Sequence, residues 1–195
     1  MKKAFFLDRD GTINKVVKKY SISHKKVIDD SPFSVSELNF NEDIKEIVNV
    51  AKNKDYEIIV VTNQPSILKG EFLMKDYEKI TTEICKYLEI DRSNVLECFH
   101  KEGLSLPCNC RKPKPGLFLM AKGLFDIDLS KSIIVGDSWK DIAAGHSAGI
   151  NKTIFLKRKP NQYQFGNLED EQKMEKENIK PSNKINSLSE LLNLL

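Results

Sequence analysis

The stretch KAFFLDRDGTIN, residues 3–14, determines the expected fold, because an apolar run leads directly into two aspartates, Asp8 and Asp10. Residues 3–8 have the pattern of a short buried strand. Two carboxylates held close together repel one another, and burial increases this cost. A hard divalent cation bound by oxygen atoms removes the penalty. The pair therefore has two interpretations: a solvated turn at a strand end, or a site that binds a cation and performs covalent chemistry.

Beyond this stretch, short apolar runs alternate with amphipathic segments. Strands are predicted over 3–8, 56–63, 95–100, 132–137 and 152–156, and helical segments over 42–54, 74–90, 114–125, 140–149 and 187–195. Such alternation is typical of a three-layer, Rossmann-like α/β fold, with helices on both faces of a mostly parallel sheet. We expect a single domain over residues 1–195, in which the polar stretch 157–184 is irregular or mobile.

The composition limits the class of protein. With 195 residues, 40% hydrophobic and 30% charged, the chain is typical of a globular domain. A net charge of +3 is too small to argue for a nucleic-acid partner. No apolar run approaches the ~20 residues that span a bilayer, and no secretory signal is recognised. We expect a cytoplasmic monomer without membrane or nucleic-acid partners, whose four cysteines stay reduced.

Polar residues follow several of the predicted strands. Ligands of parallel sheets bind at the carboxyl ends of the strands, where Asp8, Thr62 and Asp137 are expected to meet. Asp137 is a natural further oxygen ligand for a cation. Asp141 has two interpretations: it holds the waters of a metal ion, or it is an early-helix carboxylate favoured by the helix dipole.

The residue types near these positions suit phosphoryl transfer. An aspartate can act as a nucleophile, and Asp10 is placed to protonate a leaving alkoxide and then to deprotonate water. A phosphoryl group in transfer needs donors and cations around its oxygens. Thr62 and Asn63 offer a hydroxyl and an amide. Lys112 offers a point charge, and Arg111 offers a planar fork suited to phosphate.

Four motifs resemble, in this order, those of the haloacid dehalogenase (HAD) superfamily of phosphatases: FFLDRDGTIN (5–14), VVTNQ (60–64), RKPKPG (111–116) and VGDSWKDIAAG (135–145). The DRDGTIN form, the TNQ triplet and the cysteine-rich loop before RKP are similar to those of D-glycero-D-manno-heptose 1,7-bisphosphate phosphatases, with histidinol-phosphate phosphatases as close relatives. The resemblance covers about residues 1–156. The gaps between the motifs leave no room for a large cap domain, so the site should be open.

The resemblance implies a Mg²⁺-dependent phosphoric monoester hydrolase that works through an aspartyl-phosphate. It makes Asp8 the nucleophile and Asp10 the general acid and base, with Lys112 as the third catalytic residue. It places Mg²⁺ on Asp8, the backbone carbonyl of Asp10, and Asp137. The substrate contacts that it implies are Thr62, Asn63, Gln64, Arg111 and Lys112.

The stretch CFHKEGLSLPCNC, residues 98–110, contains four residues that commonly bind metal: Cys98, His100, Cys108 and Cys110. Three thiolates and an imidazole make a closed, structural Zn²⁺ site. The metal loop of the family has the same Cys-x-His and Cys-x-Cys pairs, which favours a short zinc-binding loop here. Because this loop leads directly into Arg111 and Lys112, Zn²⁺ would fix both cations. The alternative is four unrelated residues in a loop.

The expected function is removal of one phosphate from a heptose bisphosphate. The alternatives are a histidinol-phosphate phosphatase, a polynucleotide 3′-phosphatase and a non-catalytic phosphosugar-binding protein. The mild net charge speaks against polynucleotides, and the intact catalytic motifs speak against a non-catalytic protein. The lysines within residues 15–26 either attract an anionic sugar phosphate or form a solvated face.

Overall fold

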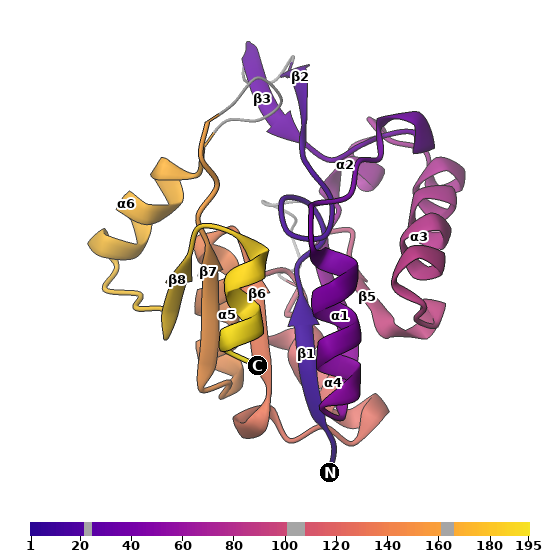
Figure 1. The fold of residues 1–195 in the computed structure, drawn as a ribbon. Coiled ribbons are helices and arrows are strands. Elements are labelled where there is room, and N and C mark those ends of the chain that lie inside the picture. The colour runs from indigo at the N-terminus through magenta and orange to yellow at the C-terminus, as the bar shows by residue number, and fades with distance from the viewer. Residues whose placement is uncertain (22–24, 101–107, 161–165) are drawn as a thin grey trace.

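A six-stranded sheet in the order β5-β4-β1-β6-β7-β8 forms the centre of this computed structural model, which describes residues 1–21, 25–100, 108–160 and 166–195 (Figure 1). Neighbouring strands of the sheet are parallel, which confirms the predicted α/β class. The strands are β1 (Lys3–Leu7), β4 (Tyr56–Asn63), β5 (Val95–Cys98), β6 (Ile133–Gly136), β7 (Lys152–Leu156) and β8 (Asn183–Ile185).

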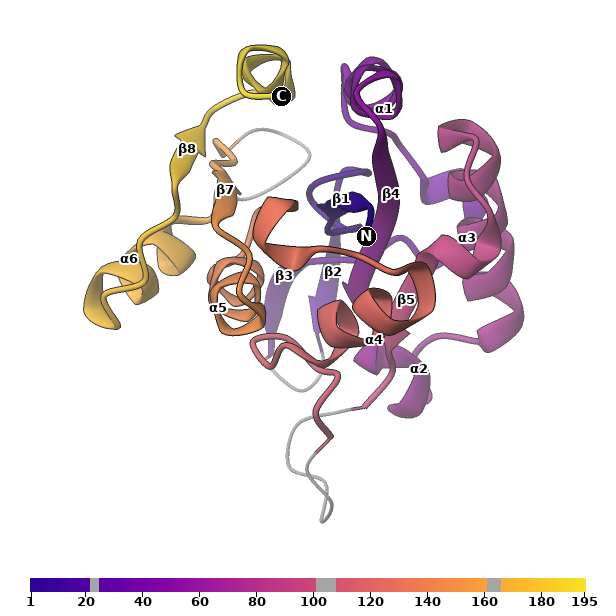
Figure 2. The same cartoon turned by 90° about the horizontal axis from the view of Figure 1, so that it is seen from below.

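Helices cover both faces of the sheet, as Figure 2 shows along the strands. They are α1 (Ile44–Asn53), α2 (Pro65–Leu68), α3 (Met74–Leu88), α4 (Gly116–Phe125), α5 (Trp139–Ala148) and α6 (Leu168–Lys176). Side chains alternate along β1, so Phe5 and Leu7 pack with α1 and α3, whereas Phe6 packs with α4, its ring centroid 5.0 Å from that of Phe118. In the described part of the chain, no helix is long and apolar enough to cross a membrane.

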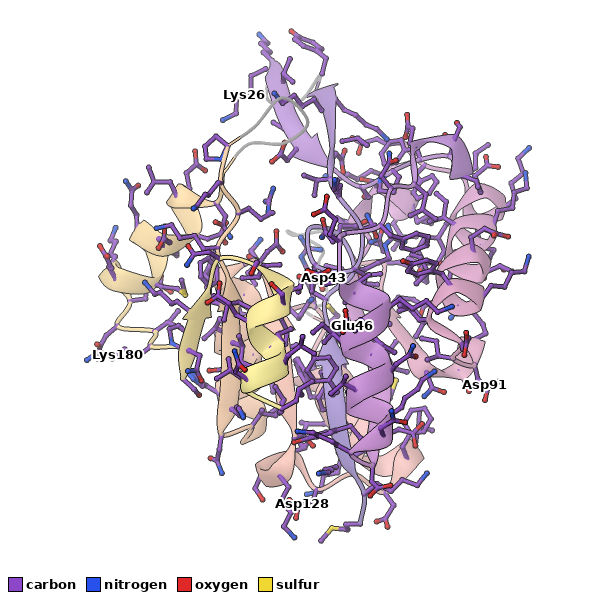
Figure 3. All side chains as sticks on the ribbon, viewed as in Figure 1. Lys26, Asp43, Glu46, Asp91, Asp128 and Lys180 are labelled. Atoms are coloured by element: carbon purple, nitrogen blue, oxygen red, sulfur yellow. The ribbon has the colours of Figure 1, made fainter. Side chains whose placement is uncertain are left out.

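A hairpin stands apart from the central sheet, at the top of Figure 1. Strands β2 (Val17–Ser21) and β3 (Lys26–Asp30) pair antiparallel with one another. The backbone closes the base of this excursion through two hydrogen bonds, from Lys15 N to Asn39 O (2.7 Å) and from Asn41 N to Ile13 O (2.9 Å). Lys26 is one of the exposed charged side chains that project outward around the molecule in Figure 3.

Two C-terminal predictions are wrong in part. Within 157–184, which was expected to be irregular, the structure has helix α6 and the start of β8, while residues 161–165 lie outside the described residues. Helix α6 is highly polar and buries mainly Met174, so it lacks a strong apolar stripe. The closing segment is a 3₁₀-helix, Leu188–Asn193, rather than an α-helix over 187–195. Its buried Leu188 and Leu191 are three residues apart, which suits a three-residue turn.

Candidate active site

The carboxyl ends of neighbouring strands bring the predicted residues to one edge of the sheet. Asp8 follows β1, Thr62 is the next-to-last residue of β4, and Asp137 follows β6. All three line a cavity of about 480 Å³, which also receives residues from the hairpin and from the segment after Cys110. The convergence expected from the topology is therefore confirmed.

Three buried carboxylates meet at the base of this cavity. Ligand oxygens of Asp8, Asp137 and Asp141 all lie within 4.8 Å of one another. Burial raises the pKa of Asp8 well above its usual value, against the pull of Lys112, and the other two carboxylates add to the rise. Burial also raises the pKa of Asp137 to about 7, although Arg158 opposes the shift. Such a set of crowded oxygens fits a hard divalent cation.

Two glycines make room for these carboxylates. A Cβ at Gly11, where φ is +95°, would lie 2.1 Å from Oδ2 of Asp137. A Cβ at Gly136 would lie 2.4 Å from the side chain of Asp141. The glycines of DRDGT and VGD are therefore needed for the close approach of backbone and carboxylate.

Asp141 takes the early-helix role that the sequence left open, and it also lies among the buried carboxylates. Its Oδ2 accepts a hydrogen bond from Ser138 N at 3.1 Å, which closes a capping box at the start of α5. Its Oδ1 accepts from Lys112 Nζ at 2.5 Å, and the same carboxylate belongs to the acidic cluster. Asp141 is thus a helix cap that also reaches the centre of the site.

Lys112 is a buried cation beside the candidate nucleophile. Its side chain is only 3% exposed, and Nζ donates to Asp8 Oδ1 at 2.6 Å and to Val61 O at 2.7 Å, besides the bond to Asp141. Burial lowers the pKa of Lys112, but the two carboxylates outweigh it and the net shift is upward. Lys112 therefore stays charged next to Asp8.

The three residues of the TNQ triplet differ in how they lie relative to the cavity. Thr62 and Asn63 line the cavity, and the Asn63 amide makes two 3.1 Å hydrogen bonds with the backbone of Lys112. Gln64 is 1% exposed and does not line the cavity within the described residues. Its Nε2 donates to Asp10 Oδ2 at 2.7 Å and to Thr62 Oγ1 at 2.9 Å. Gln64 thus lies behind the residues that line the cavity.

The four predicted zinc ligands come together next to Arg111. Ligand atoms of Cys98, His100, Cys108 and Cys110 lie within 4.8 Å of one another. The Cys98 Sγ atom lies 3.1 Å from that of Cys110 and 3.8 Å from that of Cys108, and His100 Nδ1 lies 3.3–3.4 Å from two sulfurs. Tetrahedral Zn²⁺ ligands are about 3.5–3.8 Å apart, given the usual bond lengths. The four side chains, at 3.1–3.8 Å, are already gathered at or within that spacing, and their chemistry is that of a zinc site.

The cysteine cluster also positions the cations that follow it. Arg111 NH1 donates to the His100 carbonyl at 3.2 Å, and Lys114 Nζ donates to the Cys108 carbonyl at 2.7 Å. Cys98 ends β5, so the cluster ties this strand end to Arg111. Both ends of the predicted loop are therefore anchored, while residues 101–107 lie outside the described residues.

Sequence reasoning missed Arg158, which joins the hairpin to the acidic cluster. Its NH1 donates to Asp29 Oδ2 at 2.9 Å, and its Nε lies 2.5 Å from Asp137 Oδ2. The signal was its place two residues after β7, at the same sheet edge as Asp137. Among the lysines of residues 15–26, Lys19 lines the cavity, but its Nζ is bound to Ser31 O and to Glu37.

Comparisons with known proteins agree with this architecture. A family model described as haloacid dehalogenase-like hydrolase matches residues 14–149, and a model described as HAD-hydrolase-like matches residues 109–191. A Campylobacter jejuni protein named D-glycero-alpha-D-manno-heptose-1,7-bisphosphate 7-phosphatase is 33% identical over 175 residues, which cover 86% of this chain and 92% of the relative. A Helicobacter pylori protein named as the 7-phosphatase of the beta form is 33% identical over 162 residues, which cover 81% and 86%.

A solved structure extends the likeness to the whole fold. The crystal structure of D,D-heptose 1,7-bisphosphate phosphatase from B. bronchiseptica, complexed with magnesium and phosphate, superposes with a TM-score of 0.70. The superposition covers 99% of each chain, and the two sequences are 22% identical. The two chains therefore share their fold over nearly their full lengths.

Proposed function

The chain belongs to the haloacid dehalogenase-like hydrolase family, and on this premise we propose that it removes one phosphate from a D-glycero-D-manno-heptose 1,7-bisphosphate through an aspartyl-phosphate intermediate. It is a phosphoric monoester hydrolase. The observation that carries the proposed mechanism is the Lys112 ammonium, which is buried between Asp8 and Asp141 at the base of the cavity. A carboxylate paired with a fixed cation in this way suits attack on a phosphate dianion.

The proposed reaction has two steps. In the first, an Asp8 oxygen attacks phosphorus, the bond from phosphorus to the sugar oxygen breaks, and Asp10 gives its proton to that oxygen. In the second, Asp10 takes a proton from water, which attacks the aspartyl-phosphate and releases inorganic phosphate and free Asp8. Lys112 and Arg111 supply positive charge for the phosphoryl oxygens, and Thr62 and Asn63 line the same cavity.

The acidic cluster is the proposed Mg²⁺ site. Asp8, the backbone carbonyl of Asp10, and Asp137 would hold the ion, in keeping with the crowding of buried carboxylates there. When bound, Mg²⁺ supplies charge that stabilises the phosphoryl oxygens during transfer. Asp141 keeps Lys112 in place at the edge of this cluster.

The cysteine cluster is the proposed Zn²⁺ site, with Cys98, His100, Cys108 and Cys110 as ligands. Four protein ligands leave no open position, so the role of Zn²⁺ is structural. Its effect reaches the active site through Arg111, which is bound to the His100 carbonyl.

Activity is expected to require Mg²⁺ but not added Zn²⁺. A brief EDTA treatment should stop phosphate release, and Mg²⁺ alone should restore it, because hard oxygen ligands and thiolates select different metals. The measurement is phosphate release together with elemental analysis of the treated protein. A need for Zn²⁺ in this rapid recovery would contradict the assignment of two separate sites.

Replacing Cys110 by Ser is expected to remove zinc and lower activity without unfolding the central sheet. The sheet has its own core, so the loss should stay near Arg111 and Lys112. Misplacement of such groups by ~1 Å costs around a hundredfold in rate. Elemental analysis should find about one zinc per wild-type chain, as a single four-ligand site requires. The matched control is Cys85→Ser, since Cys85 lies in helix α3 outside the cluster. Unchanged zinc and rate in Cys110→Ser would refute the zinc assignment.

The substrate proposal is tested with a panel of phosphate esters. We expect fastest phosphate release, judged by kcat/KM, from a heptose 1,7-bisphosphate, and both anomers belong in the panel because the relatives are named for both. Hexose phosphates, histidinol phosphate and a 3′-phosphorylated oligonucleotide represent the alternatives. A higher kcat/KM for histidinol phosphate or for the oligonucleotide would replace the heptose assignment with that substrate.

A further inference from the structure

The carboxylate of Asp10 is held from behind by three side chains. Arg9 Nε lies 3.1 Å from both oxygens of Asp10, and Arg9 NH2 lies 2.9 Å from Oδ2. Asn14 Nδ2 donates to Oδ1 at 3.0 Å, and Gln64 Nε2 donates to Oδ2 at 2.7 Å. Asp10 itself lines the cavity. One side of the carboxylate therefore faces the cavity, where a substrate would bind, and the other side accepts hydrogen bonds from these three side chains.

Arg9 is buried in a way that calls for an explanation. Its side chain is 0% exposed, and its guanidinium lies 5.2 Å from the ring centroid of the buried Tyr77. Burying a charge is costly unless a partner compensates it. The carboxylate of Asp10, whose Oδ2 lies 2.9 Å from Arg9 NH2, is the anion that compensates this buried charge.

In the part of the chain that the structure describes, the Arg9 side chain makes no hydrogen bond to any residue other than Asp10. Within the described residues, the hydrogen bonds of its side chain run from Nε to Asp10, and NH2 forms an ion pair with the same carboxylate. The neighbouring turn is held by the Arg9 carbonyl, which accepts from the amides of Ile13 and Asn14 at 2.8 and 3.1 Å. That turn does not depend on the side chain. The polar contacts of the guanidinium are therefore made with the Asp10 carboxylate.

We propose that Arg9, assisted by Gln64 and Asn14, positions the Asp10 carboxylate for proton transfer to the leaving oxygen. Arg9 acts through Asp10 and is a positioning residue, since it does not line the cavity within the described residues. This inference rests on the proposed function, in which Asp10 is the general acid and base. Proton transfer depends steeply on placement, so a carboxylate free to rotate is a poor catalyst.

Comparing two leaving groups shows whether Arg9 positions Asp10 or only stabilises the fold. An alcohol needs a proton as its bond to phosphorus breaks, whereas 4-nitrophenolate leaves without one. A misplaced Asp10 therefore slows release of a sugar alcohol far more than release of 4-nitrophenolate. A general loss of structure slows both releases alike.

The test compares single-turnover release of both leaving groups, with enzyme in excess over heptose 1,7-bisphosphate or 4-nitrophenyl phosphate. For Arg9→Met we expect about 100-fold slower release of the sugar and less than about 5-fold slower release of 4-nitrophenolate. Arg9→Lys keeps the charge but loses the planar fork, so its sugar release should be intermediate. Arg92→Met is the matched control, because Arg92 pairs with Glu78 and Glu97 away from the cavity, and neither release should change.

Gln64→Met keeps the inference testable if Arg9→Met fails to fold, because it removes one donor to Asp10 without touching the buried charge. Gln64→Met should also slow release of the sugar more than release of 4-nitrophenolate, but by a smaller factor than Arg9→Met. Asp10→Asn is the reference variant and should show the largest difference between the two releases. If Asp10→Asn slows both releases equally, the proposed acid role of Asp10 fails. If Asp10→Asn is selective but Arg9→Met and Gln64→Met slow both releases equally, the positioning role is overturned.

Discussion

Replacing Asp8 by Asn is expected to reduce phosphate release by about 10⁴-fold or more, as loss of a covalent nucleophile does in other hydrolases. The amide has nearly the shape of the carboxylate, and its oxygen can still accept a hydrogen bond from Lys112, whose Nζ lies 2.6 Å from Asp8 Oδ1. The fold should therefore survive while the attacking group is lost. The measurements are phosphate release and trapping with beryllium fluoride, which should attach to wild-type Asp8 and not to the variant.

The same substitution on the surface provides the control. Asp55 is exposed in a left-handed turn after α1, a conformation that Asn adopts readily, so Asp55→Asn should keep full activity. A rate for Asp8→Asn within about tenfold of the wild type, in protein free of wild-type enzyme, would remove the aspartyl-phosphate from the mechanism.

Replacing Lys112 by Met is expected to damage both catalysis and stability. Met has a similar length but no charge, so Asp8 and Asp141 would lose the ammonium that lies 2.6 and 2.5 Å from them. Breaking a buried ion pair by removing one partner costs about 3–5 kcal/mol of unfolding free energy. Activity should fall by about 10³-fold, in line with the loss of a fixed electrostatic contact to the transition state. Urea unfolding and phosphate release measure the two effects.

The control is Lys122→Met, which makes the same change at an exposed position of helix α4. It should alter the free energy of unfolding by no more than about 0.5 kcal/mol. A Lys112→Met protein with control-like stability would show that the two carboxylates do not depend on Lys112 for their burial. Wild-type activity in Lys112→Met would exclude the cation from catalysis.

The positions of Asp8 and Asp137 were predictable from the sequence, because they depend on strand pattern and sheet topology. Apolar runs end at Asp8 and Asp137, and parallel topology brings strand ends together. The cysteine cluster was expected from its residue types and from the resemblance of its paired spacing to the metal loop of the family. Side-chain alternation also applies to DRD, since it sends Arg9 to the face opposite its neighbours. The contact of Arg9 with Asp10, however, depends on the turn that follows, which spacing does not specify.

Other features were hidden because their sequence signals are weak. Helix α6 buries mainly Met174 while Leu168 is 62% exposed, so no apolar stripe marks it. Strands β2 and β3 are rich in charged residues and pair only with one another within the described residues. The task of Gln64 depends on rotamers, because its amide turns to Asp10 rather than to the cavity. Such choices are set by packing, which a single sequence does not display.

The hairpin excursion leaves and re-enters the domain at adjacent backbone positions, since Asn14 and Phe40 form a bridge between the Lys15–Asn39 and Ile13–Asn41 hydrogen bonds. For a flexible loop with fixed ends, each doubling of length costs only about 0.6 kcal/mol of closure entropy. Within the described residues, neither Asp8 nor Lys112 is hydrogen-bonded to this segment, so changes in its length or sequence need not move them. Natural selection can therefore remodel the mouth of the cavity, and with it the range of esters admitted, as long as Asp29 remains to hold Arg158 beside Asp137.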